Sequence, residues 1–95
     1  FDEDALDMLH MFVSMTEPLI GRIKKAYADK DYHDLGEAAH SLKGAARSAC
    51  CMKLGDLAGK LQDDAEKDKA DAGLIEDIAK EFERARAEIK TLKAA

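Results

Sequence analysis

Apolar residues recur every three or four positions along almost the whole chain, which is the spacing of one face of an α-helix. This periodicity is interrupted at only a few places. The 95 residues are enough for one modest hydrophobic core and too few for two. The chain has few strand-type runs of valine, isoleucine, threonine and aromatic residues, and no hairpin signal between such runs. We therefore expect a single all-α domain that spans residues 1–95.

The interruptions divide the chain into five predicted helices. Pro18 is costly deep inside a helix, so we place it in the first turn of the second helix. Ser14 and Glu17 are spaced as a capping box just ahead of it. Asp31 and Asp71 are good N-cap residues for the third and fifth helices. The helices are predicted at about residues 4–13, 18–28, 32–49, 52–66 and 72–92. Short connections favour antiparallel neighbours, so we expect an up-down antiparallel four-helix bundle with a short additional N-terminal helix.

The bulk composition narrows the possible partners and location. A general nucleic-acid binder needs a surplus of lysine and arginine, whereas this chain has a formal net charge of −5. No apolar run approaches the length of a membrane span, and no signal-peptide pattern is present, so we expect no membrane association. The neighbouring Cys50 and Cys51 seldom bridge to each other, which is typical of a reducing compartment such as the cytoplasm.

The third predicted helix carries the most informative pattern. A helix turns by about 100° per residue, so each side chain can be placed around the axis relative to His40. The apolar residues of this helix fall on the side nearly opposite His40. They are Leu35, Ala38, Ala39, Leu42, Ala45, Ala46 and Ala49. We therefore expect the His40 imidazole to point into solvent from the middle of a helix.

The residues around His40 are also unusual. Gly36 and Gly44 lie four residues to either side of it on the same face. Each interior glycine costs about 1 kcal/mol relative to alanine, which indicates that a partner must approach the imidazole closely. Lys43 and Arg47 add positive charge to this face, and a lysine there can donate charge-assisted hydrogen bonds to a phosphoryl group on the histidine. We expect Lys43 to stabilise phosphoryl charge, and Gly36, Gly44 and Arg47 to take part in docking.

The segment His40-Ser41-Leu42-Lys43-Gly44-Ala45-Ala46 resembles the H-x-L-K-G-[AS]-[AS] signature of histidine phosphotransfer (HPt) domains of multistep two-component phosphorelays. Asp31, Leu54 and Leu61 lie at the family's spacing, so the similarity covers nearly the whole chain. The resemblance implies that His40 accepts a phosphoryl group on Nε2 from a phospho-aspartyl receiver domain and passes it, reversibly, to another receiver. It also implies that Lys43 neutralises the phosphoryl oxygens and that Gly44 leaves room for the partner.

The resemblance further implies the partners, which are receiver domains of response regulators or of hybrid histidine kinases. By this analogy the receiver supplies Mg²⁺ and the acidic pocket, and the chain itself holds no cofactor. No Gly-rich phosphate loop is present, so no bound nucleotide is expected. We expect a monomeric phosphocarrier and not an autonomous enzyme, because His40 has no further acid–base machinery beside it.

Two positions depart from the family pattern. Cys50 stands where the family often has a glycine that closes the helix in the left-handed conformation, and Gln62 stands where it often has glutamate. A residue with a Cβ tolerates a positive φ poorly, so the shape of the helix end at Cys50 is open.

Two other functions remain open at this point. The bundle could be a structural adaptor that docks helices or receiver domains without being phosphorylated, in which case substituting His40 would leave its function intact. It could also be the dimerisation domain of a histidine kinase, which also places an exposed histidine on a helix. That domain usually builds its bundle from two chains, whereas this chain has enough helices to close a bundle alone.

The remaining candidate residues have plainer interpretations. His10 and His33 are predicted to be surface residues, and His33 is two turns from His40, too far for a zinc pair on one helix, so no metal site is expected. Cys50 and Cys51 are predicted to pack at a helix end. The methionines are expected mainly in the core as flexible packing residues, with a soft docking patch as the alternative. They are Met8, Met11, Met15 and Met52.

Overall fold

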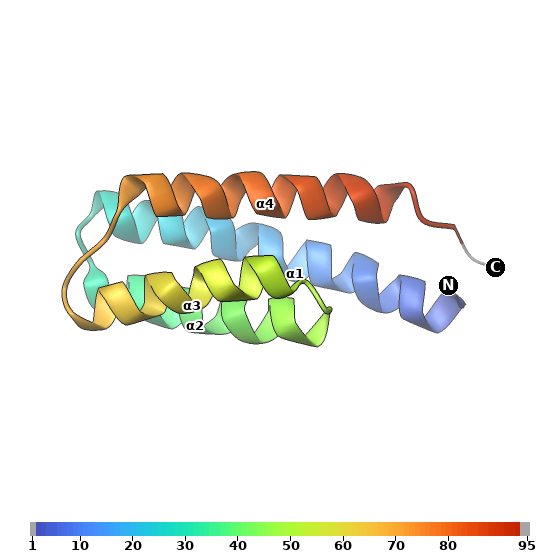
Figure 1. Ribbon diagram of the computed structural model, residues 1–95, viewed down its shortest axis with the longest axis horizontal. Helices are drawn as coiled ribbons and strands as arrows, with labels where there is room; N and C mark the ends of the chain where they lie inside the picture. The colour runs from blue at the N-terminus through green and yellow to red at the C-terminus, as the bar shows by residue number, and fades with distance from the viewer. Residues whose placement is uncertain (1, 94–95) are drawn as a thin grey trace.

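The computed structural model describes residues 2–93, which contain four α-helices and no strand. The helices are α1 (Glu3–Ala28), α2 (Tyr32–Ser48), α3 (Met52–Glu66) and α4 (Ala72–Lys90). Consecutive helices run in opposite directions along the long axis of a molecule that measures 46 × 18 × 18 Å (Figure 1). The prediction of an all-α chain is confirmed for the described residues.

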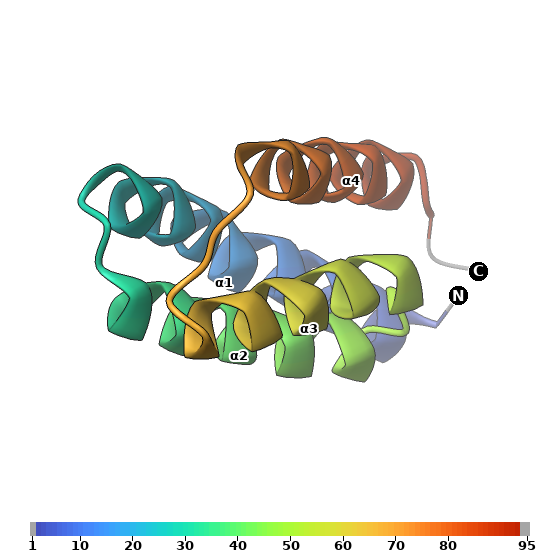
Figure 2. The ribbon, with the colours of Figure 1, turned by 60° about the vertical axis from the view of Figure 1, so that its left-hand side comes forward.

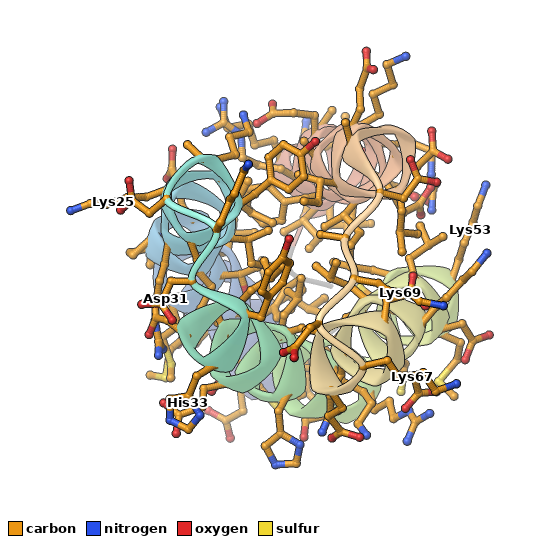
Figure 3. All side chains as sticks on the ribbon, turned by 90° about the vertical axis from the view of Figure 1, so that its left-hand side faces the viewer. Lys25, Asp31, His33, Lys53, Lys67 and Lys69 are labelled. Carbon is orange, nitrogen blue, oxygen red and sulfur yellow. The ribbon has the colours of Figure 1, made fainter. Side chains whose placement is uncertain are left out.

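Each helix packs against two others, and α2 and α3 share the most extensive contact. α2 and α3 lie side by side in one layer, and α1 and α4 lie over them (Figure 2). Seen along the bundle, polar and charged side chains such as Lys25, His33, Lys53 and Lys67 point outward around the periphery (Figure 3). Within the described residues, no helix combines the length and the apolar character that a membrane crossing requires.

Residues 3–28 form one helix, so the expected break before Pro18 and the separate N-terminal helix are wrong. Pro18 lies inside α1 and is exposed. It removes one backbone hydrogen bond, but the buried face of α1 continues past it on both sides. That face comprises Phe12, Thr16, Ile20, Ile23 and Ala26. Burial of this continuous face against the other helices outweighs the local cost of proline.

The methionines are exposed, and the expectation that they lie mainly in the core is wrong. The exposed fractions are 53% for Met8, 61% for Met11 and 63% for Met15, and Met52 is 55% exposed. On α1 the core positions are taken by the face that includes Phe12 and by its neighbours. The three methionines of α1 therefore form a separate stripe on its outer surface, at i, i+3 and i+7.

The helix N-termini are capped as predicted at Asp31 and Asp71. The Asp31 carboxylate accepts a hydrogen bond from the backbone N–H of Asp34 at 3.1 Å, and Asp71 accepts one from Gly73 at 2.9 Å. Each cap satisfies a backbone donor that a helix leaves unpaired at its first turn. These caps set the start of α2 and α4.

Each turn between helices contains one non-glycine residue in the left-handed conformation, namely Lys30, Cys50 and Asp68. Cys50 has a φ of 61°, and the N–H of the following Cys51 donates to the carbonyl of Ala46 at 2.8 Å. This is the hydrogen bond of a Schellman motif, which closes a helix most easily with glycine. Cys50 therefore adopts the glycine-type conformation in spite of its Cβ.

Replacing Cys50 with glycine tests the energetic cost of this turn. A left-handed backbone costs a residue with a Cβ about 1–2 kcal/mol, and glycine removes this cost. Part of the resulting stabilisation is lost again, because glycine loses more backbone entropy on folding. We expect Cys50→Gly to raise the free energy of unfolding by about 1 kcal/mol in urea denaturation. Ser48→Gly, inside the last turn of α2, should lower it by about 0.5 kcal/mol. A less stable Cys50→Gly variant would contradict this account.

Candidate functional site

His40 lies in the middle of α2 and is exposed to solvent. Its sequence neighbours Ala39 and Leu42, on the other side of the helix, are completely buried. The outward position that helical periodicity predicts for His40 is therefore confirmed. The imidazole stands on a rigid element, with hydrocarbon behind it and solvent in front.

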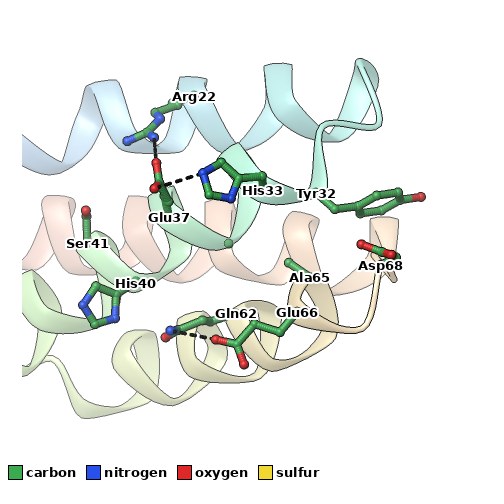
Figure 4. Close-up of a pocket in the computed structure, with 11 residues that line it drawn as sticks. Arg22, Tyr32, His33, Glu37, His40, Ser41, Gln62, Ala65, Glu66 and Asp68 are labelled. Carbon is green, nitrogen blue, oxygen red and sulfur yellow. Dashed lines mark hydrogen bonds and ion pairs between the residues drawn. The ribbon is translucent and has the colours of Figure 1, made fainter.

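His40 borders an open cavity of about 710 Å³ between α1, α2 and the end of α3 (Figure 4). Most of the residues that line it have polar or charged side chains, and α2 supplies the largest share. The lining residues are Arg22, Tyr32, His33, Gly36, Glu37, His40, Ser41, Gln62, Ala65, Glu66 and Asp68. The imidazole is thus reachable from a hollow that three helices shape.

On the α3 side of this cavity, Gln62 lies next to the His40 ring (Figure 4). The Gln62 Nε2 donates to Glu66 Oε1 at 3.3 Å. Its Oε1 is buried and has no hydrogen-bond partner among the described residues. A buried acceptor without a donor is unfavourable, and His40, which lines the same cavity, carries an imidazole N–H that can donate to it.

From the sequence, Gln62 stands out only as a departure from a family pattern, and its place in the site was not predicted. The signal that reveals it is the antiparallel pairing of α2 and α3. Gly59 faces Lys43 across this contact, so the position three residues before Lys43 pairs with the position three residues after Gly59. That pairing places residues 40 and 62 opposite each other.

On the α1 side, an ion cluster joins α1 to α2 beside the site. Arg22 Nε donates to Asp34 Oδ1 at 3.0 Å, and Arg22 Nη2 lies 3.5 Å from Glu37 Oε2. His33 Nε2 lies 3.2 Å from Glu37 Oε1. The hydrogen bond from Arg22 holds the pKa of the Asp34 carboxyl below its ordinary value. The cluster fixes how α1 lies along α2 near His40.

The other predicted site residues fall on two sides of His40. Gly44 is exposed, and a Cβ there would meet nothing within 4 Å, so this face is flat and open. Gly36 is half-buried, and a Cβ there would lie 3.5 Å from Ala65 Cβ, so it belongs partly to the α2–α3 contact. Lys43 is half-buried and Arg47 is exposed, and neither lines the cavity. Both lie on the side of α2 that faces α3.

The methionine stripe of α1 approaches the same face of α2. Arg22 pairs with Asp34, and the two helices run antiparallel. Met15 is seven residues before Arg22 and Ser41 is seven residues after Asp34, so both lie two turns from this ion pair, at the same level along the bundle. The exposed methionine stripe of α1 thus reaches the level of the residue that follows His40.

Comparison with known proteins gives one match. A family model described as Hpt domain matches residues 7–94 of the chain. No curated protein and no solved structure matches it. The matched range contains α2, α3 and α4 completely and most of α1.

The geometry at Gln62 predicts the tautomer of His40. With Oε1 of Gln62 free to accept, we expect the neutral imidazole to carry its proton on Nδ1 and to leave Nε2 with its lone pair toward solvent. Nitrogen-15 NMR of the ring measures this directly. Gln62→Leu should shift His40 toward the Nε2–H tautomer and leave the His33 signals unchanged. Identical His40 spectra in the two proteins would contradict the assignment.

Proposed function

The chain belongs to the Hpt domain family, and on this premise we propose that His40 is its phosphoryl-accepting residue in a multistep phosphorelay. Domains of this family carry phosphoryl groups on histidine in two-component signalling. His40 would take the group from a phospho-aspartyl receiver domain and pass it, reversibly, to another receiver. The observation that carries the proposal is the exposed imidazole at the middle of α2, within the signature His40–Ala46.

The transfer needs little from this chain beyond a placed nucleophile. Nε2 of the neutral ring attacks the phosphorus as the P–O bond to the receiver's aspartate breaks, and the electron pair of that bond returns to the carboxylate. The reverse transfer follows the same course. Catalysis of phosphoryl transfer is mostly positioning and charge stabilisation, and by analogy the receiver supplies Mg²⁺ and the acidic pocket. We therefore propose a carrier that holds no cofactor of its own and is not an autonomous enzyme.

Lys43 and Arg47 supply the positive charge that a phosphorylated imidazole requires. They follow His40 by three and seven residues, so both start from the same side of α2. A lysine ammonium near the phosphoryl oxygens donates charge-assisted hydrogen bonds, which are stronger than neutral ones. The chain has a net charge of −5, so this local positive charge also reduces the electrostatic repulsion between the chain and a phosphoryl group.

The docking surface for the receiver is proposed to extend from His40 toward α1. Gly44 leaves the surface of α2 flat, and Gly36 borders the cavity. Met11 and Met15 continue the surface with exposed apolar side chains that adapt to different partners. The preferred partner is thus a receiver with an apolar helix face. The carrier would work as a monomer in the cytoplasm, since four helices of one chain enclose the core.

A transfer assay tests the proposed carrier function. Receiver domains from the same genome, phosphorylated with radiolabelled acetyl phosphate, should pass label to this chain in an acid-labile, alkali-stable form. His40→Gln should abolish the label, and Lys43→Ala should slow transfer about 10-fold or more, since a hydrogen bond to a charged group contributes ~1.5–3 kcal/mol.

The control variants for this assay are His33→Gln and His10→Gln, which should be labelled like the parent chain. Label that persists in His40→Gln would overturn the proposal. A His40→Gln variant that keeps its signalling function in the cell would favour the structural adaptor instead.

A second experiment tests the docking surface. Replacing both Met11 and Met15 with glutamine keeps their length but makes the stripe polar, so we expect about 10-fold weaker binding to the receiver that transfers fastest. Isothermal titration calorimetry measures the dissociation constant. Met52→Gln is the matched control, because Met52 is similarly exposed but lines a separate cavity at the end of the bundle. Equal affinities of the double variant and the control would contradict this surface.

A further inference from the structure

α3 carries two glycines in its interior, on the side that faces α2. Gly55 is buried and Gly59 is half-buried, and they are four residues apart, one above the other on one face. Glycine weakens a helix interior relative to alanine, because it loses more backbone freedom on folding. Neither glycine has a positive φ, so backbone conformation does not require them.

The space that a side chain would fill at these positions is taken by the cations of α2. A Cβ at Gly59 would lie 3.3 Å from Cδ of Lys43. A Cβ at Gly55 would lie 3.1 Å from Cγ of Arg47 and 3.7 Å from its Nε. The separations of 3.3 Å from Lys43 Cδ and 3.1 Å from Arg47 Cγ are tighter than ordinary van der Waals contact. At Gly21 of α1, by contrast, a Cβ would meet nothing within 4 Å.

The three pairs across the α2–α3 contact follow one register. His40 lies beside Gln62, Lys43 lies over Gly59, and Arg47 lies over Gly55. The surface of α3 therefore offers an amide to the imidazole and a groove to each of the two cationic side chains.

We propose that Gly59 and Gly55 are positioning residues, which seat the aliphatic stems of Lys43 and Arg47 in a groove and so hold their charged ends on the His40 face. This inference rests on the proposed phosphocarrier function and adds to it residues outside the signature. A lysine stem free in solvent samples many rotamers, and holding it costs entropy when the phosphoryl group arrives. A stem already laid along α3 has lost most of that freedom in the folded state, so the cation is preorganised.

Gly59 offers the sharper test, because its contact is with Lys43, the cation nearest to His40 in sequence. Phosphoramidate is the donor, since it needs no protein partner and no docking surface. In that reaction the Nε2–P bond forms while the P–N bond of phosphoramidate breaks, and ammonia leaves with a proton. We expect Gly59→Ala to slow the labelling of His40 about 3-fold and Gly59→Leu about 10-fold.

Two comparisons separate positioning from a general structural effect. Gly21→Ala and Gly21→Leu make the same changes at an open helix position and should label at the parent rate. In a Lys43→Ala background, Gly59→Ala and Gly59→Leu should cause no further loss, because the residue they displace is absent. Thermal unfolding followed by circular dichroism checks that each variant is folded. If Gly59→Leu does not fold, the labelling rate of Gly59→Ala tests the positioning role by itself.

The outcomes distinguish this inference from the function on which it rests. If His40→Gln is labelled like the parent, the phosphocarrier function itself fails. If Lys43→Ala slows labelling but the Gly59 variants label at the parent rate, the positioning role is overturned. It is equally overturned if the Gly59 variants lose as much activity in the Lys43→Ala background as in the parent, since their effect would then not act through Lys43.

Discussion

The close contact between α2 and α3 is the constraint on which the rest of the structure depends. α2 buries one side completely, with Leu35, Ala38, Ala39, Leu42 and Ala46 all inaccessible to solvent. Small residues such as Gly36, Ala65 and Gly55 lie at this contact, and a Cβ at Gly55 would lie 3.7 Å from the backbone oxygen of Lys43, so the two backbones approach closely. Rotation of α2 about its axis in either direction would expose this apolar face. Core packing therefore holds His40 toward solvent, and the His40 side chain itself needs no contact to stay there.

This arrangement divides the surroundings of His40 between two helices. On the α3 side lie an amide and two cations, which suit the charge of a phosphoryl group. On the α1 side lie exposed methionines and an ion cluster around Arg22, which suit the recognition of a protein surface. For the proposed carrier, this division separates the phosphoryl chemistry from the contacts that would recognise a receiver. The adaptable side chains then belong on the docking side.

Features set within one helix were predictable from the sequence, and features set between helices were not. The expected range 32–49 agrees closely with α2, because Asp31 caps it and its apolar period is regular. The outward position of His40 follows from the same period. The continuity of α1 through Pro18 depends on a buried face that only the other helices define. The place of Gln62 and the exposure of Met15 depend on helix register, which single-helix periodicity does not contain.

Several locally unfavourable features lie on this pair of helices, in addition to those elsewhere, such as Pro18 in α1 and the left-handed Lys30 and Asp68. α2 and α3 contain the interior glycines Gly44, Gly55 and Gly59, the turn between them has Cys50 in a left-handed conformation, and Gln62 leaves a buried oxygen unpaired. Selection for stability alone would favour alanine in a helix interior wherever space allows it, as it does at Gly44. The glycines beside His40 are therefore consistent with the proposed phosphoryl transfer, for which an open approach and seated cations matter more than helix propensity.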